Sequence, residues 1–230
     1  MKITWLGHSS FRIEIGDQIL LLDPWLTNPL FPAESRAEAI KGATAILLSH
    51  GHSDHMGDTV AISKELGIPV VGKYDLTAWL EGKEGIKTVG YNNGGTVKLG
   101  DVNVTMVAAS HSSSFAGENG PIYLGTECGF MIEHAGRTIY FSGDTDVMAD
   151  MAIFNELHTP EVGILSAGGH FTMDMKRAAF AARKFFNFKT IIPCHYRTFP
   201  LLEQNAEALK AGVSPGVNVI EPEVMSPIVL

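Results

Sequence analysis

The feature that most constrains this chain is the hexapeptide HGHSDH at residues 50–55, which places four side chains able to bind metal within six positions. It follows the apolar run Ala45–Leu48, from which only Ser49 separates it, and this run predicts a buried strand. The segment after it, residues 56–67, predicts a helix that ends at Gly67. Loops at strand ends are where α/β proteins commonly place their chemistry. The sequence therefore predicts a metal-binding loop between a strand and a helix.

The composition is that of an ordinary globular chain and narrows the class of partner. Of the 230 residues, 45% are hydrophobic and 18% are charged, which predicts a substantial core. The net charge of −8, with only 17 Lys and Arg, argues against nucleic acid as a partner, because phosphate backbones are held mainly by basic side chains. We expect a small-molecule substrate, an anionic one included, since bound metal ions would reverse the local field. A homo-oligomer is compatible with the sequence.

The compartment is predicted from the first residues and from the cysteines. The opening segment MKITWLG predicts a strand rather than a basic stretch followed by an apolar one. No uninterrupted apolar run approaches the roughly 20 residues that span a bilayer. Cys128 and Cys194 each lie in a strand-like run, so no disulfide framework is expected. These features predict a cytoplasmic protein without a membrane segment.

The order of elements predicts an α/β (α+β) fold in a single domain, residues 1–230. Three strand candidates at the N-terminus are joined by very short connections, which is typical of an antiparallel meander. The second half repeats this plan, with a hairpin around Ala135-Gly136 and a helix over residues 173–186 for which Thr172 is a plausible N-cap. A last helix is expected over residues 201–211. Two such halves predict a four-layer αββα sandwich.

Three further polar residues end strand-like runs in the same manner as the hexapeptide. His111 follows NVTMVAAS, Asp144 follows TIYFSG, and His195 follows TIIPC. Successive strand and helix units can bring them to the edge of the sheet that also carries the hexapeptide. We therefore expect seven side chains to converge: His50, His52, Asp54, His55, His111, Asp144 and His195.

The order H-x-H-x-D-H, then His, Asp and His, resembles the metallo-β-lactamase superfamily, and the resemblance spans nearly the whole chain. Within it, the phrases WLGHSSF and LLLDPWL resemble small prokaryotic metal-dependent hydrolases related to the ascorbate-6-phosphate lactonase branch. The resemblance implies the metallo-β-lactamase fold. It also implies a dinuclear hydrolase that opens a small lactone or ester, or cleaves a phosphodiester.

The resemblance assigns the ligands in two sets and implies their chemistry. It implies that His50, His52 and His111 hold one metal, that Asp54, His55 and His195 hold a second, and that Asp144 bridges both. Imidazole and carboxylate ligands suit Zn²⁺, which we expect, and also manganese, iron or nickel. A hydroxide bridging two ions about 3.5 to 4 Å apart would be the nucleophile, with Asp54 orienting it or accepting its proton.

Other polar residues have both a functional and a structural interpretation. His170 lies where related phosphodiesterases place a His that assists the leaving group, but it could also cap the following helix. His8, at the end of the first strand, either reaches the site or forms a turn with Ser9 or Ser10. Asp23 could orient a ligand histidine or simply open a turn before Pro24.

Two residues after the last ligand are weaker candidates. Tyr196 and Arg197 could contact an anionic substrate, although a solvated Arg is the default.

Cys194, beside His195, should point to the opposite face if that segment stays extended.

Three other functions compete with hydrolysis. A metal-dependent oxidoreductase on the same fold is disfavoured because His52 occupies the place where related di-iron proteins carry a Glu. A non-catalytic binding module would be expected to lack ligands. An RNA nuclease conflicts with the acidic balance of the chain. The residues that choose the substrate are expected in the loops 26–36 and 112–122.

Overall fold

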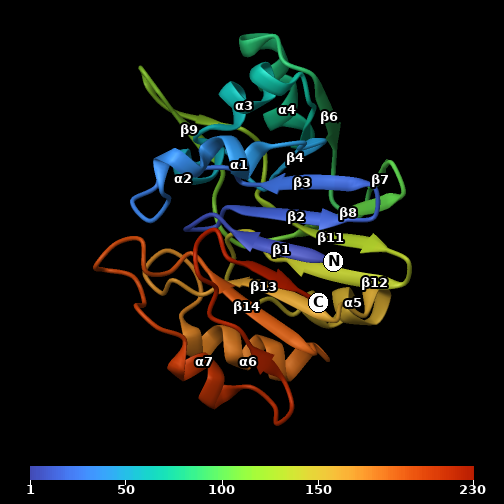
Figure 1. Ribbon diagram of the computed structural model, residues 1–230, viewed down its shortest axis with the longest axis vertical. Coiled ribbons are helices and arrows are strands. Elements are labelled where there is room, and N and C mark those ends of the chain that lie inside the picture. The colour runs from blue at the N-terminus through green and yellow to red at the C-terminus, as the bar shows by residue number, and fades with distance from the viewer.

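In the computed structural model, which describes all 230 residues, two seven-stranded sheets pack face to face, with helices on both outer faces (Figure 1). The first sheet has the order β16-β1-β2-β3-β4-β5-β6. Its strands are β1 (Lys2–Trp5), β2 (Phe11–Ile15), β3 (Gln18–Leu22), β4 (Ala45–Leu48), β5 (Val70–Lys73), β6 (Thr88–Tyr91) and β16 (Pro227–Val229). The predicted meander is confirmed, because β1, β2 and β3 pair antiparallel in sequence order.

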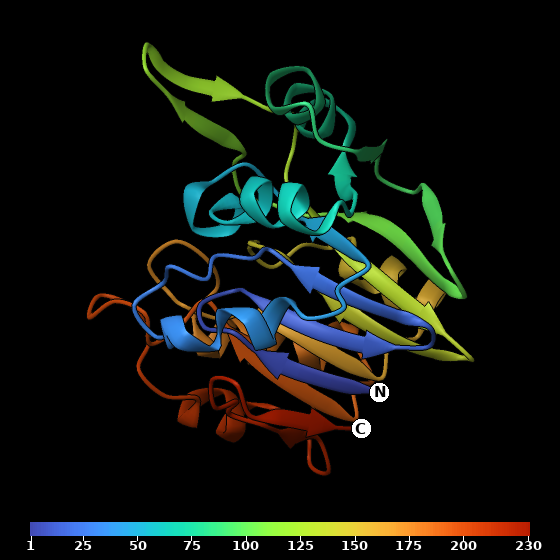
Figure 2. The same cartoon turned by 45° about the horizontal axis from the view of Figure 1, so that its top comes forward.

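The second sheet has the order β15-β14-β13-β12-β11-β8-β7. Its strands are β7 (Thr96–Leu99), β8 (Val102–Ala108), β11 (Cys128–His134), β12 (Arg137–Phe141), β13 (Val162–Ser166), β14 (Thr190–Cys194) and β15 (Asn218–Val219). The predicted hairpin joins β11 to β12, with positive φ at Ala135 and Gly136. A separate hairpin of β9 (Ser114–Gly117) and β10 (Gly120–Tyr123) projects from the body of the molecule (Figure 2).

Successive side chains along a strand point to opposite faces of the sheet, and this divides the hydrophobic core into two layers. In β3 and β4 the side chains of Leu20, Leu22 and Leu47 belong to the core shared with the second sheet, whereas Leu21 and Ile46 belong to a core beneath the helices. The helices on this outer face are α1 (Arg36–Ile40), α2 (Ser53–Met56), α3 (Thr59–Leu66) and α4 (Tyr74–Glu84). The four-layer αββα arrangement is therefore confirmed.

The other outer face carries α5 (Met151–His158), α6 (Met175–Phe185) and α7 (Glu207–Gly212). The amphipathic pattern of α6 buries Met175, Ala178 and Ala182 in the core of the second sheet. None of the helices in the structure is long and apolar enough to cross a membrane.

The predicted N-cap of α6 was wrong. Asp174, not Thr172, has the extended conformation of a cap, and its Oδ1 accepts the N–H of Arg177 at 2.7 Å. Thr172 is turned back, and its hydroxyl accepts the N–H of Gly168. The cap, and with it the start of the helix, therefore lies two residues later than predicted.

The predicted bounds of the last helix were also wrong, because residues 201–205 do not join it. The backbone of Glu203 bonds to other segments, its N–H to the carbonyl of Gly168 and its carbonyl to the N–H of Arg197. The helix starts only at Glu207. In the same way, part of the expected loop 112–122 forms the β9–β10 hairpin.

Candidate metal centre

The predicted ligands come together at one edge of the two sheets. The metal loop, residues 50–55, follows β4, while His111 follows β8, Asp144 follows β12 and His195 follows β14. Because β12, β13 and β14 run parallel, the loops at their carboxyl ends meet at one edge. The N–H of His195 donates to the carbonyl of His8 at 3.0 Å, which ties the two sheets together there.

The first group of side chains consists of His50, His52 and His111. One nitrogen from each lies within 4.8 Å of the others, and His50 Nε2 is 3.0 Å from His52 Nδ1. His50 is fully buried, with Nδ1 2.9 Å from the hydroxyl of Ser49. The N–H of His111 donates to Glu127 Oε1 at 2.6 Å, which fixes the loop that carries it.

The second group consists of Asp54, His55 and His195, and the structure adds His8 to it. His8 is fully buried, and its Nε2 lies 3.1 Å from Asp54 Oδ2. Its Nδ1 lies 2.9 Å from the hydroxyl of Thr198, a residue that no pattern in the sequence selects. Burial lowers the pKa of His8 to about 4, although the hydrogen bond to Asp54 opposes this shift. Nε2 of His8 thus faces the carboxylate of Asp54, and its Nδ1 faces the hydroxyl of Thr198.

Asp144 lies between the two groups and is almost fully buried. Its Oδ2 is 3.1 Å from Nε2 of His195, 3.2 Å from Nε2 of His55 and 3.6 Å from Nε2 of His111. One carboxylate oxygen therefore faces nitrogens from both groups.

Asp23 supports the second group from behind. Its Oδ2 lies 2.8 Å from His55 Nδ1, and both of its oxygens accept from Ser49, one from the N–H and one from the hydroxyl. The backbone of Asp23 has a φ of 42°, a conformation that non-glycine residues rarely adopt. Because the Asp23 contact holds Nδ1, the Nε2 atom of His55 is left pointing toward Asp144.

The buried carboxylates favour positive charge at this edge. Burial would lower the pKa of His55, but Asp144, Asp54 and Asp23 raise it well above its ordinary value. Burial would raise the pKa of Asp144, but His195 and His55 hold it well below its ordinary range. Burial lowers the pKa of His50 well below its ordinary value, so its imidazole is neutral at pH 7 and able to ligate.

These residues fit divalent metal ions. His55 Nε2 and Asp144 Oδ1 are buried and have no hydrogen-bond partner, although His55 Nε2 lies 3.2 Å from the other oxygen of Asp144. Unpaired buried polar atoms are costly, and a cation would supply the missing partner. Imidazole nitrogens and carboxylate oxygens are donors that zinc, manganese, iron and nickel accept.

The remaining sequence candidates lie outside these groups. His170 is exposed on the loop after β13, and its ring contacts Phe171 with 4.5 Å between centroids. Tyr196 is fully buried and stacks on Trp5 at 5.6 Å, so the interpretation that it contacts substrate was wrong. Arg197 is exposed, and its guanidinium lies over the rings of Trp5 and Tyr196, 5.9 Å from each.

The orientation argument for Cys194 does not apply, because the chain does not stay extended beyond it. His195 has a φ of 59° and Arg197 a φ of 66°. Cys194 is fully buried, and burial raises the pKa of its thiol well above the ordinary value.

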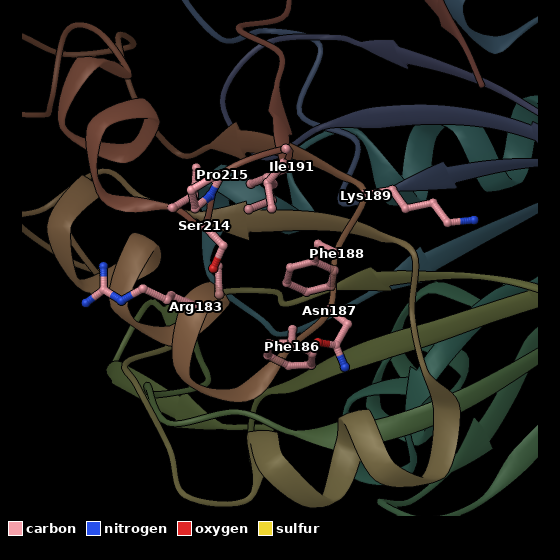
Figure 3. Close-up of a pocket in the computed structure, with 12 residues that line it drawn as sticks. Arg183, Phe186, Asn187, Phe188, Lys189, Ile191, Ser214 and Pro215 are labelled. Carbon is pink, nitrogen blue, oxygen red and sulfur yellow. The ribbon is translucent and has the colours of Figure 1, made fainter.

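A cavity of about 370 Å³ opens beside the candidate ligands, between the metal loop and the β9–β10 hairpin. It is lined by His52, Ser53, Asp54, Ser114, Ala116, Gly117, Gly120 and Pro121. Another cavity, of about 330 Å³, lies around the amino end of β14 (Figure 3). His195 follows the opposite, carboxyl end of that strand. Its two basic side chains are already bonded, Arg183 to the carbonyl of Gly212 and Lys189 to Glu161. Only the first cavity reaches candidate ligands.

We expect Asp23→Asn to weaken metal binding, because the amide cannot serve as a charged acceptor for His55 Nδ1. Loss of such an outer partner typically costs about 10- to 100-fold in affinity. A competition titration with a chromogenic chelator measures the change. Asp75→Asn is the matched control, since Asp75 is exposed in the first turn of α4. Equal affinities for wild type and Asp23→Asn would contradict this role.

The comparisons with known proteins agree with this geometry. The family model described as "Beta-lactamase superfamily domain" matches residues 2–195, and the chain belongs to that superfamily. A UPF0173 metal-dependent hydrolase of Cereibacter sphaeroides is 70% identical over 229 residues, with 99% of each chain covered. A protein of the same name from Paracoccus denitrificans is 64% identical over the full length of both chains. The chain is accordingly a metal-dependent hydrolase of the superfamily.

A solved structure agrees over the whole fold. Igni18, a metallo hydrolase from the hyperthermophilic archaeon Ignicoccus hospitalis, is 29% identical, with a TM-score of 0.84. The alignment covers 100% of this chain and 98% of that chain. The superfamily predicted from the order of His and Asp residues is thereby confirmed.

Proposed function

We propose that this chain is a dinuclear hydrolase that opens a small lactone or ester, or cleaves a phosphodiester. The observation that carries the proposal is the position of Asp144, whose Oδ2 faces Nε2 of His111 from one group and Nε2 of His55 and His195 from the other. A carboxylate in that position is suited to bridge two cations.

The residues divide into two ligand sets under this proposal. His50, His52 and His111 would hold one ion, Asp54, His55 and His195 the second, and Asp144 both. Two divalent ions, with zinc favoured and manganese, iron or nickel as alternatives, would supply Lewis acidity and an activated water.

Asp54 is the proposed proton acceptor of the reaction. Its side chain is 31% exposed, the most accessible carboxylate of the cluster, and it lines the 370 Å³ cavity. His8 holds Oδ2 of Asp54 from the buried side, and the Thr198 hydroxyl holds His8 in turn. His8 is therefore proposed to orient Asp54, and His170 to donate a proton to a leaving group that extends as far as its exposed loop.

The test is proton release in a pH-stat by the metal-reconstituted protein, because both reactions release acid near neutral pH. One panel contains lactones, including the sugar-phosphate lactones of the branch that the sequence resembles, and the other contains phosphodiesters. We expect turnover of at least one panel and a metal content of two ions per chain by mass spectrometry. A single bound ion, or no acid from either panel, would refute the proposal.

A further inference from the structure

Three aromatic side chains surround the second ligand group. The ring of Trp25 lies edge-on to His8 at 5.3 Å, and that of Phe199 lies 6.1 Å from His8 and 6.2 Å from Trp25. The ring of Phe171 lies 6.4 Å from His195. Phe171 is 54% exposed, and Trp25 and Phe199 are half-buried. Trp25, Phe171 and Phe199, here called the aromatic rim, therefore present apolar surface to solvent beside a polar cluster.

Two residues of the aromatic rim are held in place by contacts with residues close to the cluster. The N–H of Trp25 donates to the hydroxyl of Ser10, and a Cβ on Gly57 would lie only 2.5 Å from Trp25 Cδ1. This glycine lies two residues after the metal loop, so the indole ring lies against the backbone there. Phe199 follows Thr198, which is bonded to His8. Two of the three rings thus have defined positions before any ligand binds.

Basic side chains are absent from the lining of the cavity beside the cluster. The eight residues that line the 370 Å³ cavity include no Lys or Arg. Arg197 lies over Trp5 and Tyr196, and Arg177 is bonded through two nitrogens to Asp146. A carboxylate or phosphate substituent on the substrate would therefore find no free guanidinium or ammonium in this cavity.

We propose that the substrate carries an uncharged apolar group, aromatic or branched aliphatic, that packs on Trp25, Phe171 and Phe199. Its scissile bond would then lie beside Asp54, because His8 contacts both Asp54 and Trp25. This inference rests on the proposed function, and it selects neutral esters and lactones over the anionic substrates that the sequence allowed. Apolar contacts of this kind discriminate by roughly 10- to 200-fold per methylene group.

The kinetic test compares three lactones that differ in one substituent. These are γ-butyrolactone, its γ-phenyl derivative and its γ-carboxylate derivative, each assayed for kcat/KM with the metal-loaded protein. We expect the phenyl compound to exceed the other two by about tenfold or more. The Phe199→Ala variant should lose most of that preference. The control Phe180→Ala removes a ring that is 46% exposed on α6 and packs near Phe185, and it should leave the preference unchanged.

A binding test separates this inference from the proposed hydrolysis. The probes are 2-pyrrolidinone, 5-phenyl-2-pyrrolidinone and pyroglutamate, lactams that match the three lactones but resist opening. Calorimetry with the metal-loaded protein should give tightest binding for the phenyl lactam, with at least about tenfold loss in Phe199→Ala.

The outcomes of the two tests are distinguishable. Preferential binding of the phenyl lactam without opening of any lactone would support the rim and refute the proposed reaction. Tighter binding of pyroglutamate, or equal binding of all three lactams, would overturn the inference even if lactones are hydrolysed.

Discussion

Replacement of Asp144 by alanine is expected to remove metal and turnover together. Its Oδ2 lies within 3.1 to 3.6 Å of three imidazole nitrogens that belong to both ligand groups. The change should therefore weaken binding at both positions, by more than the roughly 10- to 100-fold that an outer partner contributes. Metal content by mass spectrometry and turnover in the pH-stat should fall in parallel.

A second variant and a control make this result interpretable. Asp144→Asn keeps the volume of the buried side chain. A loss of metal in this variant would therefore result from the lost charge and not from a cavity. Asp146→Ala removes a carboxylate two residues away that is 48% exposed and bonded to Arg177, and it should keep both ions. Two bound ions in Asp144→Asn, measured in a protein with wild-type circular dichroism, would exclude Asp144 as the bridging ligand.

The part of the fold that could be predicted from sequence consists of the strands with a regular apolar pattern and the polar residues that follow them. The run Ala45–Leu48 and the strands before it have alternating or continuous apolar patterns, and each becomes a buried strand of the predicted kind. The polar residues at strand ends converge because parallel strands deliver their following loops to one edge. Local patterns and strand direction were sufficient for these features.

The errors lie where hydrogen bonds to residues outside the helix override the local helical preference. Thr172 has an acceptable side chain for a cap, but its hydroxyl bonds to Gly168 on the preceding turn, and Asp174 caps instead. Residues 201–205 have helical composition, yet the backbone of Glu203 is bonded to Gly168 and Arg197. Such partners are distant in sequence or depend on the tertiary fold, so no window of sequence reveals them.

The surroundings of the site show the same limit. His8 has a φ of 51° and is 190 residues from Thr198, the partner of its Nδ1. The aromatic rim likewise combines Trp25, Phe171 and Phe199 from three separate loops. The sequence identified polar residues able to ligate and Asp23 as a partner that could orient one of them. Thr198 and the aromatic rim are recognised only from their contacts in the fold.

Gly168→Ala is expected to damage the second ligand group although it adds only a methyl group. A Cβ at this position would lie 1.9 Å from the carbonyl oxygen of His195 and 2.8 Å from its Nδ1. To make room for the methyl group, the backbone or the buried ring of His195 would have to shift, and either shift would move Nε2 of His195 away from Asp144. Overpacking of this kind costs about 1 to 3 kcal/mol. We expect a lower Tm for the metal-free protein and weaker binding of one ion.

The matched control is another glycine-to-alanine change, at a position with room for the methyl group. Gly82 is exposed within α4, and a Cβ there would meet no atom within 4 Å. Gly82→Ala should therefore stabilise the protein by roughly 0.5 to 1 kcal/mol through helix propensity and leave metal binding unchanged. Calorimetric titration of both variants should show the first ion bound normally in each and the second weakened only in Gly168→Ala. Normal binding of both ions by Gly168→Ala would show that His195 tolerates displacement and is not a ligand.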